Sequence, residues 1–218
     1  MVNFWKDGVL STIYPYIKKK EVLDIGCVDH DIRRRNKSRI WPHGFFKKYT
    51  KSVSGIDILE KDVNFLKKEG YDVSCQNAES FSFKSKFDVI FAGELIEHLS
   101  NPGNFLDRCH NHLKDDGYLI LTTPNAFCGF RWLEMVYKYT NNPHASKAKE
   151  HTVWFSPEVI EVLLERHGFK IERLDYAYYP FLRKDTFKWK ILKVLIKLTN
   201  KKFKDTMIVI ARPSDKKQ

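Results

Sequence analysis

The sequence predicts an α/β fold in which seven strands form one doubly wound sheet, mostly parallel with an antiparallel last strand, and helices cover both faces. Short apolar runs typical of buried strands alternate with helix-like runs along most of the chain. Two of the early strand-like runs end in an acidic residue, Asp24 and Asp57. No break in composition divides the 218 residues, so we expect a single domain over 1–213 and a polar tail at 214–218.

The expected elements begin with an N-terminal helix within residues 1–20. Strands are expected near 21–25, 52–57, 71–75, 86–92 and 117–123, and two closing strands at 169–179 and 206–212. Helices fill the intervals, and two of them have clear start signals in Asn101-Pro102 and Ser156-Pro157. The second of these helices should end at Gly168, because glycine readily adopts the left-handed conformation of a C-terminal cap.

Two stretches are longer than this alternation requires. Residues 31–50 extend the first loop and helix, and they place Asp57 33 positions after Asp24, where about 20 is usual. Extra residues at this edge of a sheet usually shape the pocket. Residues 180–204 form a basic amphipathic insertion before the last strand, and residues 183–204 carry nine Lys or Arg against one acid.

The basic helix at 187–201 has three interpretations. In the first, it is a surface helix whose lysines are solvated. In the second, it binds the surface of an anionic membrane, to which each lysine contributes about 1 kcal/mol. In the third, its lysines bind the phosphate backbone of RNA. No aromatic-studded RNA module accompanies it, so nucleic acid is not the partner that we expect. Four dispersed cysteines without a C-x-x-C pair indicate a reducing compartment. We expect a cytoplasmic protein. The basic helix suggests the alternative that this protein binds peripherally to the inner face of the membrane.

The two acidic strand ends predict a nucleoside-binding crevice at the carboxyl edge of the sheet. A pyrophosphate needs several small residues for close approach of the backbone, whereas Gly26 is followed by Cys27 and Val28. The expected ligand is therefore free of phosphate. S-adenosylmethionine fits, because its ribose carries two hydroxyls that can both donate to one carboxylate, for which Asp57 is the candidate.

Six motifs follow one another in a recognisable order. They are Val22 to Cys27, Gly55 to Ile58, Gln76 to Glu79, Phe87 to His98, Leu113 to Asn125, and His151 to Phe169. Together they resemble the class I S-adenosylmethionine-dependent methyltransferases with a Rossmann-like sheet, and within them the small type 11 and type 23 enzymes. The segment Trp41 to Gly44 resembles a subgroup found with polysaccharide-biosynthesis enzymes.

The resemblance implies a set of donor-binding residues. They are Asp24, Ile25, Gly26, Cys27, Asp57, Ile58, Asn77, Ala78, Glu79, Ala92, Gly93, Glu94 and His98. Ordering of the glycine loop is the alternative role for Asp24, and capping of a helix is the alternative for Asp57. The family usually has a second glycine where this chain has Val28, so we expect the loop to approach the methionine tail less closely.

Methyl transfer from a sulfonium is an in-line displacement, so positioning of the acceptor supplies most of the rate, roughly 7 to 11 kcal/mol. A base matters only where the acceptor is a hydroxyl that must lose a proton. The catalytic candidates, expected at one edge of the sheet, are His98, His151, His43 and Glu94, with Glu97 as a further alternative. For each histidine the alternative is a structural hydrogen bond to a neighbouring loop. We expect no metal, because His110 and His112 are two apart on a helix and face different sides.

Three functions remain open at this point. The first is transfer of a methyl group to a hydroxyl or amine of a small molecule or glycan. The second is modification of RNA, and the third is a non-catalytic domain that keeps the fold and has lost donor affinity through Val28. The acceptor itself cannot be derived from the sequence, because the enzymes of this class share the donor half and differ in their loops.

Overall fold

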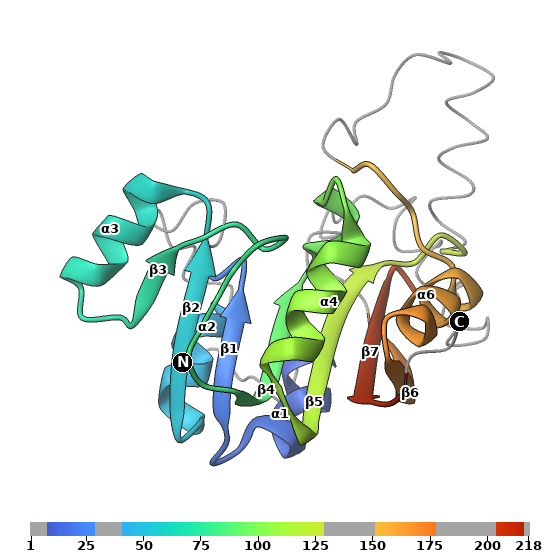
Figure 1. Cartoon of the computed structure of the whole chain (residues 1–218), viewed down its shortest axis with the longest axis horizontal. Helices are drawn as coiled ribbons and strands as arrows, with labels where there is room; N and C mark the ends of the chain where they lie inside the picture. The colour runs from blue at the N-terminus through green and yellow to red at the C-terminus, as the bar shows by residue number, and fades with distance from the viewer. Residues whose placement is uncertain (1–7, 29–40, 129–150, 178–203, 216–218) are drawn as a thin grey trace, which may run out of the picture.

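The computed structural model describes residues 8–28, 41–128, 151–177 and 204–215. Seven strands form one sheet in the order β3-β2-β1-β4-β5-β7-β6 (Figure 1). The strands are β1 (Glu21–Ile25), β2 (Ser52–Asp57), β3 (Val73–Cys75), β4 (Phe87–Gly93), β5 (Leu113–Pro124), β6 (Phe169–Ala177) and β7 (Thr206–Pro213). Every neighbouring pair is parallel except the two pairs that involve β7. The predicted fold class is therefore confirmed, including the antiparallel last strand.

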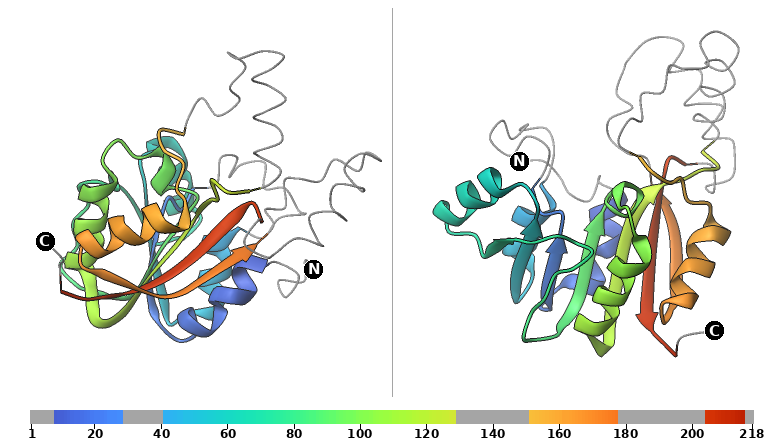
Figure 2. Two further views of the ribbon diagram at one scale, coloured as in Figure 1. Left: turned by 90° about the vertical axis from the view of Figure 1, so that its right-hand side faces the viewer. Right: turned by 45° about the horizontal axis from the view of Figure 1, so that its top comes forward.

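Helices lie on both faces of the sheet (Figure 2). They are α1 (Gly8–Ile17), α2 (Pro42–Tyr49), α3 (Glu60–Lys68), the 3-10 turn η3 (Ile96–His98), α4 (Pro102–His112) and α6 (Pro157–Arg166). Buried residues of α4 and α6 pack on one face, which includes Leu23 and Ile25 of β1. Buried residues of α1 and α2 pack on the opposite face with Val22. Because side chains alternate along a strand, Asp24 belongs to the α1 and α2 face.

The two predicted helix start signals are confirmed. The Asn101 side chain accepts a hydrogen bond from the Asn104 backbone N–H, and the Ser156 side chain accepts one from the Val159 N–H. Each cap is followed by a proline, whose fixed φ suits the first helical turn. Gly168 follows the end of α6 with φ +77°, the left-handed conformation expected for it.

Several boundaries differ from the prediction. β3 is shorter than expected, and β5 begins at Leu113 instead of near residue 117, directly after α4. The early part of β5 pairs Leu113 with Phe87 and then shifts its register. Gly117 permits this shift, since a Cβ there would lie 2.9 Å from the carbonyl oxygen of Asp88. The start of the N-terminal helix and the basic helix at 187–201 lie outside the described residues.

Among the described residues, no helix is long and apolar enough to cross a membrane.

Candidate active site

The carboxyl ends of β1, β2, β4 and β5 meet at one edge of the sheet (Figure 1). Gly26 follows β1 with φ +78°, a conformation that L side chains rarely adopt. The backbone N–H groups of Gly26 and Cys27 both donate to the carbonyl oxygen of Ile56, at 2.8 and 3.1 Å. The loop after β1 therefore turns sharply across the end of β2, and it brings the first two predicted motifs together.

Asp57 lies at the end of β2 and is 9% exposed. Its Oδ2 accepts a hydrogen bond from the Val28 N–H at 3.0 Å, and its Oδ1 accepts one from the Leu59 N–H at 3.0 Å. Burial raises the pKa of this carboxyl, and the backbone N–H groups act in the opposite direction. Each carboxylate oxygen can accept a second hydrogen bond, so Asp57 retains capacity for two ligand hydroxyls.

Val28 causes no backbone strain, and its side chain is buried. Among the described residues, the only non-glycine positions with positive φ are Lys19 and Glu94. The Val28 side chain is buried and packs in a cluster with Val63, Leu66 and Val73. A glycine is therefore not required at this position by the backbone.

Asp24 pairs with a histidine from α2. Asp24 is 2% exposed, and its Oδ2 lies 3.0 Å from His43 Nδ1. The His43 side chain has no exposed surface and contacts the rings of Trp41 and Tyr71, at centroid distances of 5.3 and 5.8 Å. The structure thus places His43 beside Asp24 and apart from His98 and His151, the other two candidate histidines.

The third motif forms a turn that is fixed to the start of α4. Asn77 Oδ1 accepts a hydrogen bond from the Glu79 N–H at 2.8 Å. Glu79 Oε1 accepts from the N–H groups of Ser100 and Asn101 at 2.8 and 3.0 Å. This Glu79 oxygen therefore makes a structural connection. Ala78 of the same turn is buried, and the Ile58 side chain beside Asp57 is 66% exposed.

The end of β4 is tightly constrained. Ala92 is buried, and a Cβ on Gly93 would lie 2.9 Å from the ring of Phe91. Glu94 has φ +50°, and its N–H donates to both the carbonyl and the hydroxyl oxygen of Thr122, at 2.8 and 3.1 Å. Strained positions of this kind concentrate at functional sites, and the chain reaches η3 directly after this one.

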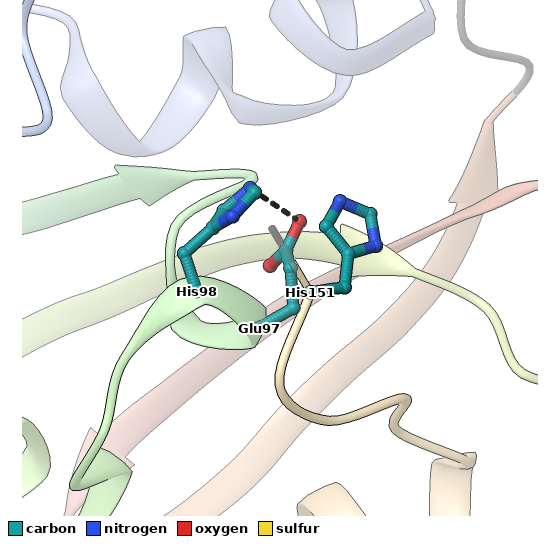
Figure 3. A group of neighbouring side chains, drawn as sticks. All are labelled: Glu97, His98 and His151. Carbon is teal, nitrogen blue, oxygen red and sulfur yellow. Dashed lines mark ion pairs between the residues drawn. The ribbon is translucent and has the colours of Figure 1, made fainter. Parts of the chain in front are cut away.

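Glu97, His98 and His151 form a cluster at this edge, which we call the acceptor cluster (Figure 3). Glu97 is 1% exposed, and its Oε2 accepts a hydrogen bond from the Thr123 hydroxyl at 2.9 Å. Its Oε1 lies 4.0 Å from His98 Nε2, and the rings of His98 and His151 meet edge to face at 4.6 Å. Two of the predicted catalytic histidines are therefore brought together with a buried carboxylate.

Thr152 joins the segment of His151 to η3. Its N–H and its hydroxyl both donate to the carbonyl oxygen of Glu97, at 2.8 and 3.0 Å. The carbonyl oxygen of Leu99 lies at the same 3.0 Å from this hydroxyl, so the two carbonyl oxygens share its one proton. Sequence reasoning missed Thr123 and Thr152. The only available signal was their position, at the end of a predicted strand and beside a candidate histidine.

The side chains of the acceptor cluster could also act as the ligands of a single metal ion. One ligand atom from each of the three residues lies within 4.8 Å of the other two. Two imidazoles and a carboxylate suit Zn²⁺ and similar divalent ions. The expectation of no metal stays a prediction.

Comparisons with known proteins agree with this architecture. Residues 3–174 match a family model described as a methyltransferase domain. A ubiquinone biosynthesis O-methyltransferase of Nitrobacter winogradskyi is 39% identical over 112 residues, which are 50% of this chain and 43% of that protein. The mitochondrial ubiquinone biosynthesis O-methyltransferase of Rattus norvegicus is 28% identical over 203 residues, 83% of this chain and 54% of that protein. The chain thus spans about half the length of these two curated relatives.

Solved structures share the fold over nearly the whole chain. A SAM-dependent methyltransferase from Methanosarcina mazei has a TM-score of 0.62 at 19% identity, over 93% of this chain and 97% of that chain. The magnesium protoporphyrin IX methyltransferase of Synechocystis, solved with bound SAH, has a TM-score of 0.60 at 14% identity, over 98% of this chain and 89% of that chain. At these identities the likeness concerns the fold.

Proposed function

Because the chain belongs to the family of methyltransferase domains, we propose that it moves a methyl group from S-adenosylmethionine to a hydroxyl of a small molecule. The observation that carries this proposal is the position of the acceptor cluster at the same sheet edge as Asp24 and Asp57. The relatives named as O-methyltransferases support a hydroxyl acceptor. A sugar hydroxyl, as in a glycan, belongs to the same chemical class and remains within the proposal.

The residues on the donor side fit a cationic nucleoside. S-adenosylmethionine supplies an electrophilic methyl group on a sulfonium. Asp57 accepts from the ribose hydroxyls, since the hydrogen bonds from the Val28 and Leu59 N–H groups leave lone pairs on its oxygens. Asp24 and Asp57 are buried carboxylates, and neither pairs with a Lys or Arg among the described residues. Among the residues that the structure describes here, a positively charged ligand would complement these two carboxylates.

The acceptor cluster removes the proton of the hydroxyl. A base of this kind typically contributes about 10² to 10⁴ in rate. His98 and His151 are half-buried and can reach a ligand, whereas Glu97 is fully buried. Glu97 is held by Thr123, and its Oε1 lies 4.0 Å from His98 Nε2, so a proton that His98 takes from the hydroxyl arrives beside a carboxylate.

The proposal is tested by donor titration followed by an acceptor screen. Donor binding is measured by calorimetry, and transfer is measured with isotopically labelled methyl donor on phenols, aliphatic alcohols, sugars and transfer RNA. We expect transfer to one class of hydroxyl. Transfer only to RNA, or donor binding without any transfer, would contradict the proposal and favour one of the other two functions.

Variants then locate the base. Glu97→Gln, His98→Asn and His151→Asn are compared with His167→Asn. His167 is the control because it too is a histidine beside a carboxylate, with Nδ1 3.0 Å from Asp107 Oδ1. We expect kcat to fall by about 10² to 10⁴ in at least one cluster variant and to stay unchanged in the control. Activity that is lost to a chelator and restored by a divalent cation would overturn the assignment of a base, because the cluster would then act by holding a metal.

A further inference from the structure

The pair of Asp24 and His43 has a geometry that the acceptor chemistry does not use. His43 comes from the first turn of α2, and its ring lies against the face of β1 and β2 that α2 covers. Asp24 is paired in register with Gly55, and a Cβ on Gly55 would lie 2.8 Å from His43 Cε1. Glycine at position 55 therefore provides the space that the imidazole ring occupies.

The surroundings of His43 fix its orientation. The ring is fully buried beside Trp41 and Tyr71. Its Nδ1 has the Asp24 carboxylate as partner, whereas its Nε2 is buried and makes no hydrogen bond in the described part of the chain. A carboxylate accepts only, so the ring proton belongs on Nδ1, from which it is donated to Oδ2 of Asp24.

This hydrogen bond leaves the other oxygen of Asp24 available. Among the described residues, Oδ1 accepts no hydrogen bond, and no Lys or Arg pairs with the carboxylate. Asp24 also lies close enough to Asp57 for its charge to raise the pKa of that carboxyl. Because neither carboxylate has a Lys or Arg partner in the described ranges, a cationic group of the ligand can bind between them.

We propose that His43 is a positioning residue for the methyl donor, and that its Nδ1–H holds Asp24 so that Oδ1 accepts from the ammonium group of the donor's methionine tail. This assignment rests on the donor of the proposed function and is independent of the acceptor. It gives His43 a role through Asp24, in place of the role of a base that the sequence suggested. Because second-shell partners orient the groups that bind a ligand, removing one weakens the specific contact that it supports.

The test compares two ligands that differ by one group. S-adenosylhomocysteine and its deaminated analogue, in which hydrogen replaces the ammonium group, are titrated by calorimetry into wild type, His43→Leu and His43→Asn. The asparagine side-chain nitrogen stands the same number of bonds from Cβ as Nδ1 and can replace it as donor. We expect the wild type to prefer the ammonium-bearing ligand by about 10- to 100-fold, as for a hydrogen bond between charged groups. The preference should vanish in His43→Leu and return in His43→Asn.

The outcomes separate positioning from a structural role. Equal weakening of both ligands in His43→Leu, or an unchanged preference, would overturn the proposal. If His43→Leu fails to fold, His43→Gln takes its place, because its longer side chain cannot present nitrogen at the position of Nδ1. His167→Leu is the matched control, and it should keep the wild-type preference because its partner Asp107 belongs to α4. If the wild type binds neither ligand, the proposed donor itself is wrong, and this inference fails with it.

Discussion

The substitution Thr123→Val examines the acceptor cluster directly. Thr123 is fully buried in β5, and its hydroxyl donates to Glu97 Oε2 at 2.9 Å. Valine keeps the branched shape and removes the hydroxyl. The variant therefore deprives a buried carboxylate of one donor without opening a large cavity, so the measured loss reports on the hydrogen bond.

The neighbouring residue provides a matched control. Thr122 is also buried in β5, and its hydroxyl oxygen accepts from the Glu94 N–H at 3.1 Å. The same N–H also donates to the Thr122 carbonyl oxygen at 2.8 Å, so it keeps an acceptor in Thr122→Val. A hydrogen bond to a charged group contributes about 1.5 to 3 kcal/mol, and a bond between neutral groups about 0.5 to 1.5 kcal/mol.

These free energies convert into melting temperatures. For a chain of this length, 1 kcal/mol corresponds to a change of about 2 to 4 °C in Tm. We expect Thr123→Val to lower Tm by about 3 to 12 °C and Thr122→Val by about 1 to 6 °C. Calorimetric melting of both variants, with kcat on the best acceptor, measures the difference. Equal losses, or a larger loss in Thr122→Val, would refute the assignment of Thr123 as the residue that holds Glu97.

Three further substitutions test the donor side and the strained turn. In Gly55→Ala the new Cβ would lie 2.7 Å from Cys27 Sγ, so urea unfolding should show a loss of about 1 to 3 kcal/mol that Cys27→Ala partly restores; no recovery would place the clash elsewhere. Burial raises the pKa of Asp57, so the affinity for S-adenosylhomocysteine, measured by calorimetry, should weaken as pH falls through that raised pKa. At neutral pH, Asp57→Asn should bind this ligand about 10- to 100-fold more weakly than the wild type. If Asp57→Asn kept the same pH dependence, Asp57 would not be the carboxylate that binds the ligand. Glu94 has a positive φ that costs about 1 to 2 kcal/mol in an L residue, and Glu94→Gly removes this cost. In thermal unfolding, Glu94→Gly should therefore be at least as stable as Glu94→Ala. A lower stability of Glu94→Gly would show that the backbone at this position is not strained.

The raised pKa of Asp57 also determines how this residue makes the stability of the fold depend on pH. A carboxyl whose pKa is higher in the folded protein than in the unfolded chain binds its proton more tightly in the folded state. Its contribution to stability is present at low pH and is lost as pH rises through the folded-state pKa. Ionised Asp57 therefore costs stability at neutral pH, and a ligand that donates to the carboxylate should offset this cost.

Most of the donor side could be predicted from the sequence. Parallel strands buried on both faces appear as continuous apolar runs, and β1 and β4 have this pattern. Asp24 near the end of β1 and Asp57 at the end of β2 then lie at one edge, because parallel strands share their direction. The early start of β5 could not be predicted, since residues 114–117 resemble a turn and fall in the register shift between the Leu113 and Tyr118 pairings with β4.

The pairing of His43 depends on packing that a linear pattern does not contain. The sequence suggested that residues 31–50 shape the pocket, but not which face of the sheet the helix within them covers. That face is fixed by alternation in β1, where Asp24 lies on the same side as Val22, and by the phenylalanines of α2 that pack there. Gly55 then leaves room for the ring. These three conditions together place one nitrogen beside one carboxylate.

The partners of the three buried carboxylates explain how one edge can treat a donor and an acceptor differently. Asp57 is held by backbone N–H groups and Asp24 by a buried imidazole, so both keep lone pairs for a ligand. Glu97 faces a half-buried histidine, and the charge that it stabilises can therefore arrive as a proton on that ring. In the proposed function, the carboxylates of β1 and β2 therefore bind a cationic ligand, whereas Glu97 stands beside a histidine that accepts a proton. If this division is correct, Glu97→Gln should reduce kcat while leaving the dissociation constant of S-adenosylhomocysteine within about 3-fold, because uncharged Gln preserves the shape of the side chain and removes only its charge. If calorimetry showed that Glu97→Gln also binds S-adenosylhomocysteine much more weakly, the charge of Glu97 would contribute to binding of the methyl donor, and the division would be wrong.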